Sequence, residues 1–373
     1  MSDTLELLAN LGAEESDWTR MVSHPRVRTV ARLWAALFPA DARLVGPGAP
    51  EPPRLAGALA HTQDEPALAE LCFSPGALVP WLSTIEARSL AQEHGLTLAA
   101  CDPDIVRYVH DKAFAHHVAL ETGLIPESLA DSTLVLHASE LTSARDVRAR
   151  IAQAVALWPD ALRARFTVKP RIGTSGRGRV SGVDGDVSEE RLANALPRLR
   201  AAGGAIVEPW LDRVADVSAQ LHIASATDVR VLGTLRQLTS EHGAPLGHAG
   251  EIGCSGHVSS GLDCDEALRV AASLLGLAAA QQGFRGVCGV DALLFRNVHG
   301  HATLRPVVEL NARFTMGTVA LGHVARARRA GLVEGAATVH VGAIASAWEC
   351  AYDREIPLLE DDRSVLLRVA LAT

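Results

Sequence analysis

The chain has 373 residues, enough for two or three domains with substantial cores, and 48% hydrophobic with 21% charged residues is ordinary soluble composition. Its net charge of -8 argues against a general nucleic-acid or anionic-membrane surface, so a small-molecule partner is expected. The six cysteines have no C-x-x-C spacing, so neither a zinc site nor a disulfide scaffold is predicted.

The amino terminus lacks the basic and apolar regions of a signal peptide, and no apolar run approaches the ~18 residues that cross a bilayer. A cytoplasmic location without membrane contact is therefore expected. Of the 35 basic side chains only Lys112 and Lys169 are lysine. A planar guanidinium does not replace a compact ammonium where a single phosphate oxygen is met in a tight space. We therefore expect a phosphate-binding role at these two positions, with coding bias as the alternative.

Residues 1–108 alternate helix-like and strand-like pieces, with candidate strands at 41–45, 69–73 and 96–100. Such alternation predicts a small α/β domain with a parallel sheet. No G-x-G-x-x-G sequence follows these strands, so a dinucleotide fingerprint is absent. Substrate contacts or scaffolding are the expected roles of this domain.

The next pattern is helical from Asp111 to residue 122, and a strand is predicted at 165–170 before a glycine-rich stretch. That stretch contains Gly173, Thr174, Ser175 and Gly176. Glycines and hydroxyl residues between strands predict a mobile hairpin whose backbone N–H groups can approach phosphates. The G-K-[ST] ending of a Walker A loop is missing, which excludes a P-loop fold. Taken alone, the stretch is more often a flexible turn than a phosphate clamp.

Residues 205–220 are predicted to form a strand, a bend and a second strand. Pro209 interrupts the hydrogen-bonding ladder at the bend, leaving backbone groups that could pair with an adenine edge. Asp216 could then reach ribose hydroxyls.

Residues 287–295 and 304–314 are runs rich in β-branched or aromatic side chains, separated by turn formers. This pattern predicts a β-hairpin with antiparallel arms. Side chains two residues apart share a strand face, so Glu309, Asn311 and Arg313 are expected together on one side.

If Gly300 lies at the centre of the turn, Asp291 lies directly opposite Glu309, with Cβ atoms about 4.5–5.5 Å apart. Two carboxylates repel at that spacing, and a cation between them would remove the repulsion. Asp291, Glu309 and Asn311 offer oxygen ligands, the chemistry of Mg2+, which leaves other positions for substrate phosphates. A nucleotide site is the first hypothesis, and an edge hairpin whose polar face is only solvent-exposed is the alternative.

Together and in this order, these pieces resemble the ATP-grasp superfamily, which includes D-alanine:D-alanine ligase, biotin carboxylase and carbamoyl-phosphate synthetase. The resemblance covers roughly residues 109–320. A D-K pair eleven residues before a glycine turn matches Asp111-Lys112 with Gly123, and the V-K-P strand before a glycine-rich loop matches the sequence around Lys169. Both lysines of the chain thus fall on the two nucleotide lysines of the superfamily.

The E-x-W-L adenine hinge of the superfamily is matched by Glu208, Pro209, Trp210 and Leu211. The ribose acid falls at Asp216, one residue later than usual and shorter than the usual Glu. The Gly-Val-Asp291 and E-x-N-x-R sequences match the metal and catalytic motif. Where the D-alanine ligase branch has an arginine two residues before the first metal Asp, this chain has Gly289, so the motif is more similar to the carboxylase and amino-acid ligase branches.

The resemblance implies an α/β chain with the ATP-grasp fold. It implies an N-terminal parallel α/β domain at 1–108, a linker helix with a small mobile glycine-rich lid at 109–207, and an antiparallel-sheet subdomain with a C-terminal extension at 208–373. ATP would lie between the lid and the C-terminal subdomain. Residues 326–373 match nothing in the superfamily.

The resemblance also implies which residues form the site. ATP would contact Lys112, Lys169, Gly173, Thr174, Ser175, Gly176, Glu208, Pro209, Trp210, Leu211 and Asp216. Asp291, Glu309 and Asn311 would hold Mg2+, with two ions expected and Mn2+ as a substitute. Arg313 and Lys169 would be the catalytic residues.

The activity implied is transfer of the γ-phosphoryl group of ATP to a small carboxylate, followed by attack of an amine on the acylphosphate and release of ADP and phosphate. The carboxylate, for example an amino acid or a peptide, and the amine are expected to be small molecules, and a homodimer is compatible with the resemblance. A kinase or carboxylate-thiol ligase would share every ATP motif. A nucleotide-binding pseudoenzyme is disfavoured because both lysines and all three metal residues are present.

Overall fold

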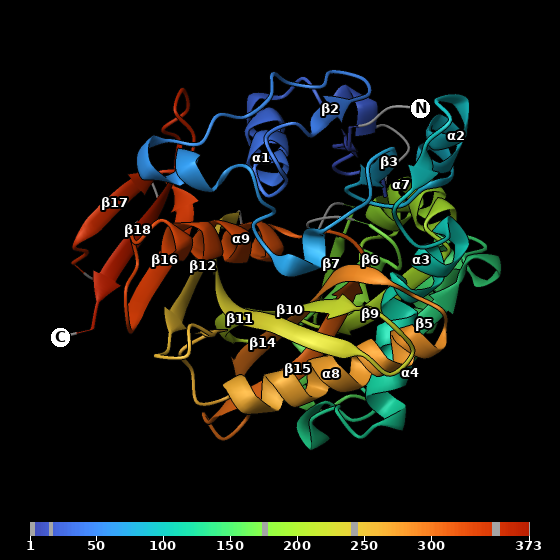
Figure 1. Cartoon of the computed structure of the whole chain (residues 1–373). Coiled ribbons are helices and arrows are strands. Elements are labelled where there is room, and N and C mark those ends of the chain that lie inside the picture. The colour runs from blue at the N-terminus through green and yellow to red at the C-terminus, as the bar shows by residue number, and fades with distance from the viewer. Residues whose placement is uncertain (1–3, 15–17, 174–177, 240–244, 345–350, 373) are drawn as a thin grey trace. The chain divides into compact units, whose positions relative to one another are not determined.

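The computed structural model of the protein describes residues 4–14, 18–173, 178–239, 245–344 and 351–372 (Figure 1). Thr174, Ser175 and Gly176 of the predicted glycine-rich lid lie outside these described residues. No helix in the described ranges combines the length and the apolar character that a membrane crossing requires.

The chain divides into two compact units. Unit 1 consists of Met1–Val106, Asp216–Asp291 and Asn311–Thr373, and unit 2 consists of Arg107–Ala215 and Ala292–Leu310. This division by contacts differs in kind from the predicted three-part division at residues 108 and 207, which stays a prediction.

The N-terminal part of unit 1 is a parallel sheet with the strand order β2-β1-β3-β4, which confirms the predicted parallel α/β architecture. Its elements are β1 (Glu6–Leu8), α1 (Pro25–Ala35), β2 (Arg43–Val45), β3 (Ala77–Pro80), α2 (Ile85–Glu93) and β4 (Thr97–Leu98). Thr84 begins α2 by accepting a hydrogen bond from the backbone N–H of Ala87. Ala87 and Ala91 then pack with Leu8 and Leu78 of the sheet.

The strand predicted at residues 69–73 is wrong, because Ala69–Leu71 form a short 3-10 helix. The strand instead comes at β3, after the Pro75-Gly76 turn, and all four of its residues are buried. A short apolar run does not distinguish a strand from a turn of helix by periodicity alone.

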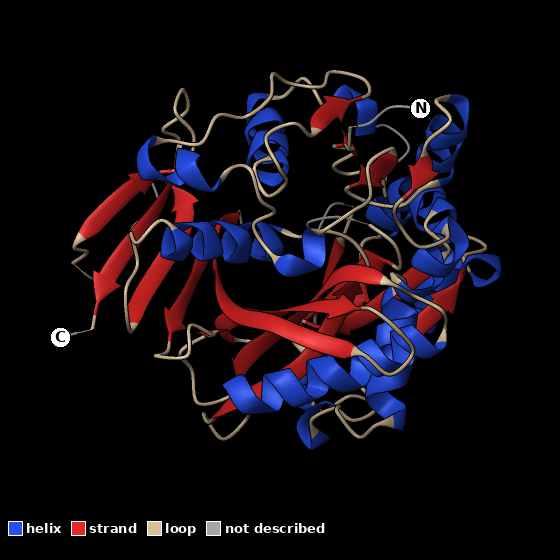
Figure 2. Ribbon diagram, in the orientation of Figure 1, coloured by secondary structure: helices blue, strands red, loops and turns tan. Residues whose placement is uncertain are grey.

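A second sheet has the order β15-β14-β10-β11-β12-β16-β18-β17, with β13 paired to β12 (Figure 2). Its strands are β10 (Arg213–Ile223), β11 (Val229–Thr239), β12 (Pro245–Ile252), β13 (Val258–Ser259), β14 (Gly286–Arg296), β15 (Ala302–Asn311), β16 (Ala337–Ala343), β17 (Arg354–Pro357) and β18 (Val365–Leu371). The pairs from β10 through β12 and β16 to β18 and β17 are antiparallel. Strands β16, β17 and β18, which fall in the extension at 326–373, therefore lengthen this sheet.

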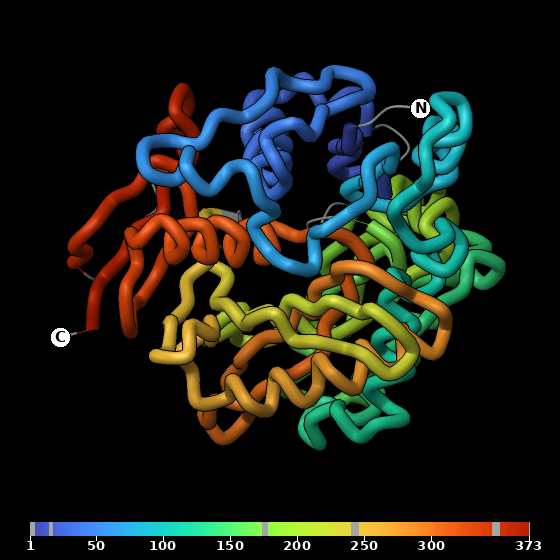
Figure 3. Tube along the Cα trace, viewed as in Figure 1, coloured from blue at the N-terminus to red at the C-terminus, as the bar shows by residue number. Residues whose placement is uncertain are grey.

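Two helices of unit 1 accompany the sheet, α8 (Asp265–Gln281) and α9 (Met316–Arg329) (Figure 3). A Cβ atom at Gly276 of α8 would lie 2.7 Å from a methyl carbon of Val229 on β11, so the close packing of helix on strand requires glycine. Arg326 of α9 is fully buried, and its guanidinium donates to the backbone carbonyls of Ala36, Phe38 and Glu65. These bonds fix α9 to the N-terminal segments of the same unit.

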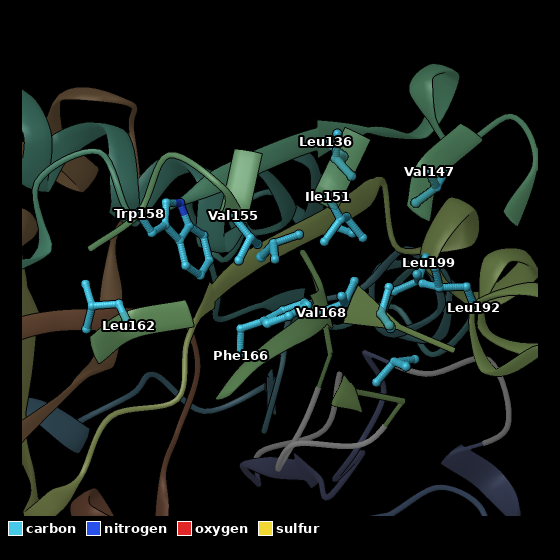
Figure 4. Packing of buried hydrophobic residues seen from close by; sticks show 14 of the residues in the cluster. Leu136, Val147, Ile151, Val155, Trp158, Leu162, Phe166, Val168, Leu192 and Leu199 are labelled. Atoms are coloured by element: carbon cyan, nitrogen blue, oxygen red, sulfur yellow. The ribbon is translucent and has the colours of Figure 1, made fainter. Parts of the chain in front are cut away.

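Unit 2 contains a sheet with the order β5-β9-β6-β7-β8 and several helices. They are α4 (Lys112–Glu121), β5 (Leu134–His137), α5 (Ala144–Val155), α6 (Asp160–Arg163), β6 (Arg165–Pro170), β7 (Val180–Val183), β8 (Asp186–Val187), α7 (Glu189–Ala201) and β9 (Gly204–Pro209). Unit 2 begins at Arg107, within α3 (Pro103–Val109). Val168 of β6 packs with Ile151 of α5 and Leu199 of α7 in the core of this unit (Figure 4). This core supports β6 and β9, the strands that carry Lys169 and Glu208.

Candidate functional site

The first predicted lysine is held at the start of α4 in unit 2. Asp111 is the N-cap of this helix, and its carboxylate accepts from the N–H of Ala113 at 2.8 Å. The same carboxylate forms an ion pair with the guanidinium of Arg171 at 2.6 Å. The backbone N–H of Lys112 donates to the carbonyl of Arg171 at 3.1 Å. The helix start is thus joined to the end of β6, which fixes the position of Lys112.

The Lys112 ammonium lies 2.8 Å from a carboxylate oxygen of Glu309 on β15. The side chains are 10% and 22% exposed, so water screens this ion pair only in part. Burial opposes ionisation of Glu309, but Lys112, and beyond it Lys169 and His110, lower its pKa to about 2. Both lysines of the chain therefore lie close enough to Glu309 to stabilise its negative charge.

The second predicted lysine belongs to a buried three-residue cluster in the same unit, which consists of Lys169 on β6, Glu208 on β9 and Arg305 on β15. Lys169 contacts one carboxylate oxygen of Glu208, and Arg305 donates to the other at 2.8 Å. Burial alone would raise the pKa of Glu208, whose side chain is 6% exposed, but Arg305 and Lys169 hold it well below its usual range. Glu208 is therefore a carboxylate neutralised by two cations.

The predicted adenine hinge, residues 208–211, begins at Glu208 and continues past the end of β9. The strand β9 ends at Pro209, and the backbone N–H of Trp210 donates to the carbonyl of Arg165 at 2.8 Å. The side chain of Leu211 joins the core of unit 2. The Trp210 ring is surrounded by guanidiniums 4.7 to 5.7 Å from its centroid, those of Arg165, Arg179 and Arg213. An adenine edge would therefore use hinge backbone groups other than the Trp210 N–H.

Two of the predicted metal ligands meet in unit 1. Asp291 on β14 accepts from the Asn311 amide at 3.0 Å on one oxygen and from the Gln237 amide at 2.8 Å on the other. Gln237 lies on β11 directly opposite Asp216 of β10, the predicted ribose acid. Sequence analysis missed Gln237, because only the strand register places it beside Asp216 and Asp291.

The third predicted ligand, Glu309, precedes Asn311 by two residues on β15. In the described ranges, no group of three or more His, Cys, Asp or Glu side chains is arranged to hold a metal. The predicted set reaches three donors only through the Asn311 amide. Two carboxylates and an amide oxygen still fit Mg2+, which commonly retains water and phosphate oxygens as its other ligands.

The geometry predicted for Arg313 is wrong. The strand β15 ends at Asn311, and the N–H of Arg313 bonds back to the carbonyl of Asn311 at 2.8 Å, so Arg313 lies on a turn and not on the strand face. Next to Arg313, Phe314 packs against Trp34, with ring centroids 5.3 Å apart. Arg313 instead donates to Glu14 at 2.5 Å within unit 1.

The assumed centre of the hairpin turn is also wrong. The N–H of Asn297 donates to the carbonyl of His301 at 2.9 Å, which centres the turn on His299 and not on Gly300. The direct opposition of Asp291 and Glu309 does not follow from this turn. What favours a cation at this place is therefore the oxygen chemistry of the side chains and not the hairpin register.

The sequence matches no protein-family profile and no curated protein. Solved structures with a similar fold include biotin carboxylase from Campylobacter jejuni in complex with β-γ-ATP, with TM-score 0.52 and 14% identity over 99% of this chain and 87% of that chain. D-alanyl-alanine synthetase A from Vibrio cholerae gives TM-score 0.50 and 13% identity over 85% of this chain and 90% of that chain. A structure described as an ATP-grasp superfamily protein from Archaeoglobus fulgidus gives TM-score 0.50 and 15% identity over the whole of both chains. Likeness at such low identity concerns architecture alone, and it confirms that this chain has the ATP-grasp fold.

Proposed function

We propose that the protein is an ATP-dependent ligase that activates a small carboxylate as an acylphosphate and joins it to an amine. The observation that carries this proposal is that the only two lysines of the chain each pair with a mostly buried carboxylate, Lys112 with Glu309 and Lys169 with Glu208. A cluster of cations beside buried carboxylates suits a polyphosphate, which would replace the carboxylates as partner of the ammonium groups. The structures with similar folds include an ATP complex and a D-alanyl-alanine synthetase, which agrees with this assignment.

In the proposed reaction a carboxylate oxygen of the substrate attacks the γ-phosphorus of ATP, and ADP leaves. An amine then attacks the acyl carbon, phosphate leaves with the former carboxylate oxygen, and the amine loses a proton. Lys112 and Lys169 would orient the phosphates, since phosphoryl transfer depends on positioning and charge neutralisation. Asp291, Glu309 and Asn311 would hold Mg2+, two ions in this proposal with Mn2+ as a substitute, and the metal would neutralise charge on the phosphates.

Turnover is expected to release ADP and phosphate. The measurement is a phosphate-release screen over amino acids and other small carboxylates, with and without amines, followed by mass spectrometry of the product. An amide product would support the ligase. AMP with pyrophosphate would instead indicate an adenylating enzyme, and a phosphorylated product without phosphate release would indicate a kinase. A protein with both Lys112 and Lys169 changed to Met should be inactive in every arm.

Lys169→Arg is expected to weaken ATP binding by about tenfold, roughly 1.4 kcal/mol, although the charge is conserved. The reason is spatial, because Lys169 shares the buried Glu208 carboxylate with Arg305, and a second planar guanidinium would crowd the first. Isothermal titration with ATP measures the effect. Arg296→Lys, which exchanges a guanidinium for an ammonium of the same charge at an exposed position of the same unit, is the control. Parental affinity in Lys169→Arg would contradict the argument from lysine scarcity.

A further inference from the structure

Arg305 was not singled out by the sequence, yet it is part of the buried cluster around Glu208. Its Nη2 donates to Oε2 of Glu208 at 2.8 Å, and its Nε donates to the carbonyl of Val307 at 3.3 Å. The side chain is 12% exposed. Lys169 uses Oε1 of the same carboxylate. The two cations therefore occupy different oxygens, so one can leave without displacing the other.

Under the proposed function, Lys169 must turn from Glu208 to a phosphate oxygen. Removing one partner of a buried ion pair normally leaves an uncompensated charge, which is strongly unfavourable. Without Arg305, the departure of Lys169 would leave Glu208 as a buried carboxylate whose charge is not compensated. With Arg305 in place, the carboxylate keeps one charge-assisted hydrogen bond throughout.

Nearby cationic groups in unit 2 do not substitute for Arg305. His116 lies near Arg305 and Glu208, but burial, its neighbour His117 and Arg305 itself lower its pKa, so it is neutral at pH 7. Lys112 is paired with Glu309 at 2.8 Å. Arg305 is thus the group placed to hold Glu208 when Lys169 leaves it.

We propose that Arg305 is a positioning residue for nucleotide binding, which keeps Glu208 neutralised and thereby frees Lys169 to bind a phosphate of ATP. This inference rests on the proposed function and deepens it. It makes the affinity for phosphates depend on a residue that does not itself touch the nucleotide. It also predicts that the two lysines depend on different groups. Lys112 is paired with Glu309, a proposed metal ligand, whereas the release of Lys169 from Glu208 depends on the side chain of Arg305.

The test is a set of binding titrations with ATP, ADP and adenosine on the full chain. Arg305→Met should weaken ATP and ADP binding by about tenfold or more, because Glu208 then retains Lys169, whereas adenosine binding should change by less than about twofold. If Arg305→Met folds poorly, Arg305→Gln replaces it, because glutamine keeps a hydrogen-bonding group without the charge. The same loss of ATP and ADP binding is expected for Arg305→Gln. Arg305→Lys should stay within about threefold of the parent, and Arg296→Met is the control for removing an exposed arginine from the same unit.

A double-mutant cycle with Glu208→Gln completes the test. Without the carboxylate, residue 208 no longer holds the Lys169 ammonium, so adding Arg305→Met in that background should change ATP affinity by less than about threefold. An equal loss in both backgrounds would mean that Arg305 contacts the nucleotide itself, which overturns the proposal. An equal loss for adenosine and ATP, or no loss for either, overturns it too. A parent chain that binds no ATP would instead refute the proposed function.

Discussion

Glu309→Gln is expected to eliminate Mg2+-dependent turnover in a protein that still folds. The substitution keeps the shape of the side chain but removes the charge that the metal requires. We expect activity to fall by about 100- to 1000-fold or more, the scale reported for loss of one decisive electrostatic contact in a transition state. Steady-state phosphate release, together with titration of Mg2+ in the presence of ADP, measures the effect.

The structure changes the expected stability of this variant. A carboxylate on a solvent-exposed hairpin face would contribute less than ~1 kcal/mol to the free energy of unfolding. Glu309 is instead paired with Lys112, and its loss leaves a mostly buried ammonium without that partner, so we expect unfolding to become easier by about 2 kcal/mol. Adding Lys112→Met should recover stability without recovering turnover. Mg2+-dependent activity at the parental rate in Glu309→Gln would leave the ion pair as a purely structural feature.

Local sequence patterns predicted the parts of the fold that depend on short-range interactions. Asp111 caps α4 where a helix start was expected, and the pieces predicted at 41–45 and 96–100 contain β2 and β4 of the expected parallel sheet. The scarcity of lysine identified Lys112 and Lys169, and the structure brings both near Glu309. A residue type that is almost absent from a chain is informative at the few positions where it remains.

The contacts that sequence analysis missed join residues far apart in the chain. Arg305 meets Glu208 across 97 positions, and Gln237 meets Asp291 across 54. Each pairing depends on strand order and register, which a single sequence does not determine. The strand predicted at residues 69–73 was wrong for a different reason. A short apolar run has no periodicity that distinguishes a strand from a 3-10 helix.

Arg313 is a predicted site residue whose predicted geometry is wrong. The sequence placed it on a strand face, directed at phosphates. In the structure its guanidinium meets Glu14, whose side chain is 1% exposed, and Arg313 itself is 14% exposed. The proposed catalytic role of Arg313 must therefore be separated from a structural role that the ion pair alone would explain.

Arg313→Met is accordingly expected to have two effects. It should lower the free energy of unfolding by about 3–5 kcal/mol, because it removes the guanidinium partner of a buried carboxylate. It should also reduce kcat by about 100- to 1000-fold, or about 2.7–4 kcal/mol, if the guanidinium stabilises the transferring phosphoryl group or the oxyanion that follows. Chemical denaturation measures the first effect, and steady-state kinetics at a temperature where the variant is folded measures the second.

The variant that separates the two effects is the double change Glu14→Gln with Arg313→Met. Neutralising Glu14 removes the buried charge that has lost the Arg313 guanidinium, so most of the lost stability should return. If Arg313 acts on the reacting groups, kcat should remain as low as in the single variant, because no guanidinium has been restored. If Arg313 serves only to neutralise the buried carboxylate of Glu14, kcat should return together with stability. Recovery of both would remove Arg313 from the catalytic machinery, whereas recovery of stability alone would confirm it as a catalytic residue despite its place on a turn beyond β15.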